Sequence, residues 1–232
     1  MKPVKYYDLV QTDRTANLYI FGDITSWPWQ ESDVSSYLLS RQLQELDVDR
    51  IDVHINSYGG EVAEGWAIYN SLKNHKAKIR TICDGMACSI ASVIFMAGDE
   101  RIMNNVSTLM IHNAWSSTTG NASAHRKEAD DLDKVSKLSA KAYRDCVSID
   151  DTKLEELLAN ESFIGPEEAL EMGFATSISA VGDPNAVQQS AKRRIMRQLM
   201  SQSHTTTPAP QEPPAEKDLS TFLSALCKGG KE

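Results

Sequence analysis

The sequence contains no long run of apolar residues. The longest, residues 87–98, is too short to cross a bilayer and is interrupted by Ser89 and Ser92. The first ten residues, MKPVKYYDLV, lack the apolar stretch of a secretory signal. We therefore expect a cytoplasmic protein without a membrane partner.

Cysteine is scarce, and its spacing predicts no special chemistry. The four cysteines are Cys83, Cys88, Cys146 and Cys227, and they form no CxxC pair. Without an export signal they are expected to be reduced thiols. The phosphate-binding motif GxxxxGK[ST] is also absent, so any ATP-driven step must come from another chain. We expect no metal and no cofactor.

The chain has no excess of positive charge. Its 24 Lys and Arg residues stand against 32 Asp and Glu residues, which gives a formal charge of −8. An acidic chain gains little from counterion release on nucleic acid, so a nucleic-acid partner is disfavoured. Apolar residues make up 41% of the 232 residues, which is ordinary for a globular protein and enough to form a core without disulfides.

Hydrophobic periodicity predicts alternating strands and helices. The expected strands are residues 18–22, 50–56, 78–83, 101–103 and 107–111. The expected helices are residues 33–46, 61–74, 87–96, 122–147, 152–159 and one that starts at Pro166. Residues 50–56 alternate apolar and polar side chains, which predicts a strand with one polar or ligand-facing side. The alternation favours an α/β fold with a mostly parallel sheet.

The last fifty residues differ in composition from the rest. Residues 191–200 could form a short basic helix, residues 203–216 are a Pro/Thr-rich linker, and residues 219–227 are a short amphipathic segment. We therefore expect two parts, a folded domain over residues 1–181 and a flexible C-terminal extension over residues 182–232.

Three turns that each follow a predicted strand carry the residues suited to chemistry. They are the Gly59-Gly60 pair, the segment DGMACSIAS with Ser89 at a strand-to-helix turn, and His112 at a strand end. Loops at the carboxyl ends of parallel strands converge on one site. A neutral imidazole is the usual base for a serine hydroxyl. Taken singly, each has a structural alternative: a tight turn, a helix N-cap and a surface histidine.

Together these segments resemble the ClpP family of serine peptidases, within the ClpP/crotonase fold. The resemblance rests on INSYGGEVAEGWAIYNSL, DGMACSIAS, LMIHNA and ESFIGPEEALEMGF, and it covers about residues 18–178. It implies repeated β-β-α units and identifies residues 122–147 as the long handle helix that stacks one ring on another. A homo-oligomeric ring is therefore expected.

The resemblance also implies roles for individual residues. Ser89 matches the nucleophile and His112 the general base, while Gly60 and Ile90 match the two backbone donors of the oxyanion hole. The third member of the triad falls on Glu161, where the family usually has Asp. The next two candidates, Asp150 and Asp151, stay open.

The family has two branches with different partners. Housekeeping members receive unfolded chains from a Clp-type ATPase, and a phage and prophage branch matures virus heads by cleaving scaffold and capsid proteins. The segments KYYDLV and LYIFGDI, Glu in an N-E-S-F setting and the long tail favour the phage branch, which would act in the host cytoplasm or the assembling head. Two other classes remain: a crotonase-like acyl-CoA enzyme and a non-catalytic assembly protein.

Overall fold

The structure is a computed structural model that describes residues 9–12, 14–28 and 33–179. The predicted extension over residues 182–232 and its boundary near residue 181 lie outside the described residues. None of the helices in the described ranges is both long and apolar enough to cross a membrane.

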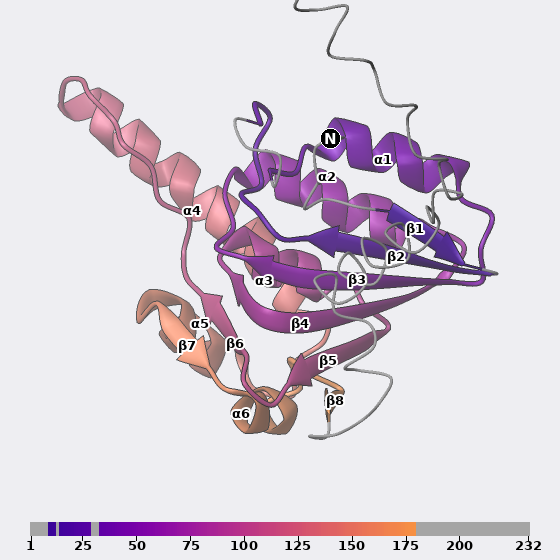
Figure 1. Ribbon diagram of the computed structural model, residues 1–232. Coiled ribbons are helices and arrows are strands. Elements are labelled where there is room, and N and C mark those ends of the chain that lie inside the picture. Colours follow the sequence, from indigo (N-terminus) through magenta and orange to yellow (C-terminus); the bar gives the residue numbers. More distant parts are fainter. Residues whose placement is uncertain (1–8, 13, 29–32, 180–232) are drawn as a thin grey trace, which may run out of the picture. The chain divides into compact units, whose positions relative to one another are not determined.

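An eight-stranded sheet organises these residues (Figure 1). Its strands are β1 (Leu9–Thr12), β2 (Thr15–Ile20), β3 (Arg50–Ser57), β4 (Lys78–Cys88), β5 (Glu100–Asn104), β6 (Thr108–Ile111), β7 (Ser162–Ile164) and β8 (Ser177–Ser179). The order is β1-β2-β3-β4-β5-β8, and β6 pairs with both β4 and β7. Only β1–β2 and β6–β7 are antiparallel among the described pairs. The predicted α/β class with a mostly parallel sheet is confirmed.

The described residues also form six helices. They are α1 (Ser36–Glu45), α2 (Val62–Lys73), α3 (Ile90–Phe95), α4 (Ala122–Arg144), α5 (Asp151–Ala159) and α6 (Pro166–Glu171). In Figure 1, α1 and α2 lie together on one side of β2 and β3, while α4 projects away from the sheet. Helix α3 packs between the sheet and the helices, and each of its six residues is buried.

Most residues of strand β3 are buried, on both faces of the sheet. Its alternate aliphatic side chains are fully buried: Ile51, Val53 and Ile55. The opposite side is polar, as predicted, and its central residues Asp52 and His54 are buried. There Asp52 accepts two hydrogen bonds from Arg80, at 3.0 and 2.5 Å, and His54 pairs with Asp84 at 2.8 Å. Asp52 and Nδ1 of His54 are thus held by partners within the sheet, whereas Nε2 of His54 is buried without a hydrogen-bond partner among the described residues.

The prediction for residues 78–96 was wrong in its boundaries. A strand ending at residue 83 and a helix from residue 87 were expected, but β4 continues to Cys88 and α3 starts at Ile90. Residues 80–83 pair with β5 and residues 86–88 pair with β6, so Asp84 and Gly85 mark a change of partner rather than a strand end. As a consequence, Ser89 is the single residue between β4 and α3.

The long charged helix is present, three residues shorter than predicted. Asn121 caps its start, because its side-chain oxygen accepts hydrogen bonds from Ser123 N and Ala124 N at 3.1 Å. Its buried residues are Ala140, Ala142 and Tyr143, all near its C-terminal end. That end alone joins the core, and the rest of α4 is largely exposed.

Candidate active site

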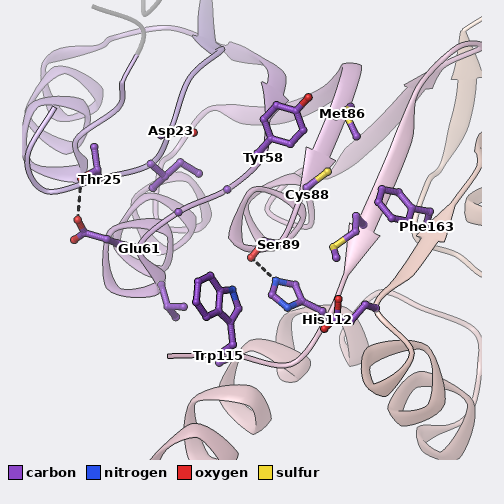
Figure 2. A pocket seen from close by; sticks show the side chains of 17 residues that line it. Asp23, Thr25, Tyr58, Glu61, Met86, Cys88, Ser89, His112, Trp115 and Phe163 are labelled. Atoms are coloured by element: carbon purple, nitrogen blue, oxygen red, sulfur yellow. Dashed lines mark hydrogen bonds between the residues drawn. The ribbon is translucent and has the colours of Figure 1, made fainter. Parts of the chain in front are cut away.

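Ser89 occupies a strained turn and directs its hydroxyl at His112. Its backbone has φ 54° and ψ −128°, a region that non-glycine residues rarely adopt. Its side chain makes no cap hydrogen bond to α3; instead, Ser89 Oγ lies 2.7 Å from His112 Nε2 (Figure 2). The alternative of a simple N-cap serine therefore does not describe this hydroxyl. Such strain costs about 1–3 kcal/mol and is typical of functional sites.

Strand pairing explains why the serine and the histidine meet. Cys88 of β4 pairs in parallel with Met110 of β6, and Ser89 N donates to Met110 O at 2.8 Å. The chain leaves β6 at Ile111, so His112 is the first residue beyond the strand, next to the turn that carries Ser89. The sheet thus positions both side chains at the same edge.

The pair opens into a cavity of about 810 Å³. The cavity is lined by Asp23, Ile24, Thr25, Tyr58, Gly59, Gly60, Glu61, Val62, Met86, Cys88, Ser89, Met110, His112, Ala114, Trp115, Glu161 and Phe163. Figure 2 shows Ser89 and His112 with Tyr58, Trp115 and Phe163 around them. These three aromatic residues are 74%, 76% and 63% exposed, so their side chains are largely open to solvent beside the pair.

The Gly59-Gly60 turn packs directly against the Ser89 turn. A Cβ atom on Gly59 would lie 2.8 Å from Ser89 Cβ, and its φ is +102°. A Cβ atom on Gly60, with φ +146°, would lie 2.1 Å from Ile24 O. Only glycine fits both positions. Hydrogen bonds from Ile24 N to Gly59 O (2.9 Å) and from Glu61 N to Ile24 O (2.8 Å) fix the loop on either side of Gly60.

Two backbone amides near Ser89 have no acceptor within the described part of the chain. Gly60 N–H lies between the two hydrogen bonds to Ile24 and makes none itself. Ile90 N–H is at the first position of α3, where an amide has no partner inside its helix. Both belong to turns that line the cavity, and free amides of this kind bind a developing oxyanion.

Glu161 lies across from His112 in the register of β6 and β7. Ile111 pairs with Ser162 in the antiparallel ladder, so the next positions outward are His112 and Glu161. Glu161 is exposed, lines the cavity and has φ 50°. In the described residues no hydrogen bond joins its carboxylate to His112 Nδ1. The register therefore places the two residues at neighbouring strand ends, and the role of Glu161 as the triad acid stays a prediction.

The two other acidic candidates are engaged elsewhere. Asp150 caps α5, where its carboxylate accepts a hydrogen bond from Lys153 N at 2.8 Å. Asp151 accepts a hydrogen bond from Arg144 Nε at 2.6 Å. Neither lines the cavity, so the structure does not bring them to His112.

Cys88 is adjacent to Ser89 but is not placed as a nucleophile. Its side chain is 5% exposed, and burial raises the pKa of its thiol. A thiol that stays protonated is a poor nucleophile. Of the two side chains, only the Ser89 hydroxyl has a hydrogen bond to His112 among the described residues.

Several cavity residues were not predicted from the sequence. They are Asp23, Trp115 and Phe163. Trp115 is a large exposed aromatic residue three positions after His112, and that closeness to a candidate motif is the signal that could have identified it.

Comparisons with known proteins match the central part of the chain. The Clp protease family profile covers residues 27–181. The ATP-dependent Clp protease proteolytic subunit of Deinococcus radiodurans is 35% identical over 130 residues, which is 55% of this chain and 64% of that protein. The chain therefore spans a little under two thirds of that relative's length.

Two further relatives carry the same name. The subunit of Borrelia garinii subsp. bavariensis is 28% identical over 163 residues, covering 69% of this chain and 82% of that protein. The subunit of Borreliella afzelii is 29% identical over 147 residues, covering 62% and 74%. The prediction of a Clp-type protease agrees with the name of these relatives, which are proteolytic subunits of an ATP-dependent Clp protease. With the profile matching well over half of its length, the chain belongs to the Clp protease family.

Proposed function

We propose that this chain is a serine endopeptidase in which Ser89 is the nucleophile and His112 the general base. The observation that carries the proposal is the 2.7 Å contact between Ser89 Oγ and His112 Nε2 in an open cavity. Gly60 and Ile90 supply the oxyanion hole, and Glu161 orients the imidazole. These roles are supported by the cavity that Gly60 and Glu161 share with Ser89 and His112, and by the position of Ile90 directly after Ser89.

The reaction follows from the geometry. With the proton of neutral His112 on Nδ1, Nε2 accepts the hydroxyl proton as Ser89 Oγ attacks the peptide carbonyl. The carbonyl oxygen becomes an oxyanion beside the amides of Gly60 and Ile90, each worth about 3 kcal/mol. The protonated imidazole then gives its proton to the leaving amine as the C–N bond breaks. Water, deprotonated by His112, releases the acyl group from Ser89.

The Ser89–His112 contact separates this proposal from an acyl-CoA enzyme. An enzyme of the crotonase type needs the oxyanion amides but has no use for a serine hydroxyl aimed at a histidine. A non-catalytic assembly protein would need neither the oxyanion amides nor the serine–histidine contact. The strained φ of 54° at Ser89 would then cost stability without serving a function. Labelling of Ser89 by a fluorophosphonate supports the peptidase and contradicts both alternatives.

For the biological role, the proposal is cleavage of scaffold and capsid proteins during phage head maturation, by a homo-oligomeric ring that needs no ATPase. Its support is the sequence: the N-E-S-F setting of Glu161, the opening segments and the long extension. The alternative is a subunit that receives chains from a Clp-type ATPase, and the relatives' name, ATP-dependent Clp protease proteolytic subunit, favours it.

One assay distinguishes the two roles. Purified chain is incubated with candidate scaffold and capsid proteins and with an unfolded control protein, each with and without a Clp-type ATPase and ATP. Cleavage of scaffold or capsid protein without the ATPase is the result expected for head maturation. Cleavage that appears only with ATPase and ATP supports the alternative.

A further inference from the structure

The carbonyl group of Ser89 is held by a second serine. Ser92 Oγ donates to Ser89 O at 2.5 Å, and Ser92 N–H donates to the same oxygen at 3.0 Å. This carbonyl belongs to the peptide unit that also contains Ile90 N–H. Because a peptide unit is planar, any rotation that moves the carbonyl oxygen of Ser89 also swings the N–H of Ile90.

A buried tyrosine completes the chain of hydrogen bonds. Tyr143 Oη lies 2.7 Å from Ser92 Oγ. A carbonyl can only accept, so the single hydroxyl proton of Ser92 goes to Ser89 O, and Tyr143 must donate to Ser92. Ser92 is fully buried and Tyr143 is 2% exposed, so water is not an alternative partner for either. The direction Tyr143 to Ser92 to Ser89 is therefore fixed.

Tyr143 itself is fixed by its place in the fold. It lies in the buried last turns of α4, and its ring packs against Phe174 with the ring centres 5.9 Å apart. Burial also raises the pKa of Tyr143, so the hydroxyl keeps its proton and stays a donor. Helix α4 thus reaches the Ser89 turn through one side chain.

We propose that Ser92 and Tyr143 are positioning residues that hold Ile90 N–H toward the oxyanion. The inference rests on the proposed serine peptidase function. The turn needs such support because Ser89 has φ 54° and ψ −128°, a conformation that the backbone does not favour by itself. Hydrogen bonds accepted by the carbonyl also polarise the peptide unit and strengthen its N–H as a donor.

Three variants test the proposal: Ser92→Ala, Tyr143→Phe and the double variant. Tyr69→Phe is the matched control, since Tyr69 is a half-buried tyrosine of α2 whose hydroxyl has no hydrogen-bond partner in the part of the chain described. For each protein, kcat and KM are measured on a fluorogenic peptide, the rate of Ser89 labelling on a fluorophosphonate, and Tm by calorimetry.

Activity and stability are expected to change differently. Ser92→Ala lowers kcat and the labelling rate roughly tenfold or more with KM within about twofold, because an oxyanion donor acts in the transition state. It also lowers Tm by roughly 3–8 °C, because the Tyr143 hydroxyl is left buried without a partner. The double variant removes that hydroxyl and regains much of the Tm, but its kcat stays at the level of Ser92→Ala. Tyr143→Phe alone lowers kcat by about threefold, and Tyr69→Phe leaves kcat unchanged.

The outcomes that overturn the proposal are distinct from those that overturn the peptidase function. If kcat recovers in the double variant together with Tm, Ser92 and Tyr143 contribute stability only. If every variant labels at the wild-type rate, the pair does not position the oxyanion hole, although the peptidase function stands. If the wild-type protein is not labelled at Ser89 and cleaves no peptide, the proposed peptidase function is wrong, and this inference is wrong as well. Should Ser92→Ala fail to fold, the double variant compared with wild type gives the same decision.

Discussion

Ser89 and Glu161 are the two non-glycine residues with a positive φ among the described residues, 54° and 50°, and both line the same cavity. Each lies at a junction between a strand and a helix, and each is next to His112: Ser89 through a hydrogen bond and Glu161 through the register of β6 and β7. Backbone strain persists where the surrounding structure enforces it, and it gathers at functional sites. Because Glu161 combines a positive φ with a place in the cavity lining, we assign it to the same site as Ser89.

Replacement of the hydroxyl and of the adjacent thiol should have opposite results. Ser89→Ala is expected to lower kcat on a fluorogenic peptide by at least about 10³-fold, as expected for loss of a nucleophile. Cys88→Ala should keep kcat within about threefold, because the raised pKa of Cys88 keeps its thiol protonated. Activity that survives in Ser89→Ala and disappears in Cys88→Ala would assign the nucleophile to the thiol.

The role of Glu161 as the triad acid can be tested against the other two acidic candidates, which lie at the start of α5. Glu161→Gln is expected to lower kcat by roughly a hundredfold, because a neutral amide cannot stabilise the imidazolium of His112. Glu161→Asp should fall between this variant and wild type.

The matched controls are Asp150→Asn and Asp151→Asn. Asn keeps the cap of α5, and Asp151 pairs with Arg144 at the surface, so both variants should keep kcat within about twofold. A large loss in either control with an unaffected Glu161→Gln would move the acid role to residue 150 or 151.

A methyl group at Gly60 should displace the oxyanion amide. In Gly60→Ala the Cβ would lie 2.1 Å from Ile24 O, so the loop must move and the hydrogen bond from Glu61 N to Ile24 O is lost. We expect kcat to fall by about 10²-fold, comparable with removal of one oxyanion donor. Gly165→Ala is the control, because its nearest neighbour is 3.9 Å away. Equal kcat in the two variants would show that Gly60 N–H has no role.

Buried Cys83 predicts a loss of stability at alkaline pH. Burial raises the pKa of Cys83 to about 12, whereas in the unfolded chain it is about 8.5. Between these values the folded state holds a proton that the unfolded state has released, so the free energy of unfolding falls as pH rises from about 9 towards 12. Below pH 8 the contribution is complete.

Urea unfolding at a series of pH values measures this effect. Cys83→Ala should be less stable at pH 7 because a buried side chain is shortened, yet its stability should decline less steeply above pH 9. Parallel pH profiles of wild type and variant would show that Cys83 ionises normally in the folded protein.

The cavity carries negative charge, which predicts a substrate preference. Asp23, Glu61 and Glu161 line it, and none of the described residues that line it is Lys or Arg. Hydrogen bonds from Ser26 and Thr25 lower the pKa of Glu61, so this carboxylate is ionised at neutral pH. Peptides with Lys near the scissile bond should be cleaved faster than their Asp counterparts.

The preference should depend on Glu61 and on salt. Glu61→Gln is expected to reduce the ratio of kcat/KM for Lys over Asp peptides by about threefold at low ionic strength, and less at 0.5 M salt. Glu156→Gln, on α5 outside the cavity, should leave the ratio unchanged. The same ratio in all three proteins would mean that Glu61 does not contact the substrate.

The parts of the site that lie at strand ends could be predicted from the sequence. Helix α2 was placed to within one residue at each end, and the strands before Gly59, Ser89 and His112 bring these residues to one edge through parallel pairing. Apolar alternation and glycine pairs are strong local signals. The rule that the carboxyl ends of parallel strands converge then predicts that the residues after these strands share one site.

Other features depend on tertiary pairing that local patterns do not contain. The continuation of β4 past Asp84 and Gly85 is stabilised by β6, a partner more than twenty residues away. The three-residue strands β7 and β8 are too short to show periodicity. Strand β2 covers Thr15–Ile20 rather than residues 18–22, because its start pairs with Arg50 of β3. The Tyr143–Ser92 contact, 51 residues apart in sequence, has no local signal at all.

Mass spectrometry of the chain after reaction with a fluorophosphonate tests the account most directly. We expect one phosphonyl group per chain on the peptide that contains Ser89, none in Ser89→Ala, and labelling at least about 10²-fold slower when His112 is replaced by Ala. Labelling at another residue, or equal labelling of wild type and His112→Ala, would contradict the assignment of Ser89 and His112 as nucleophile and base.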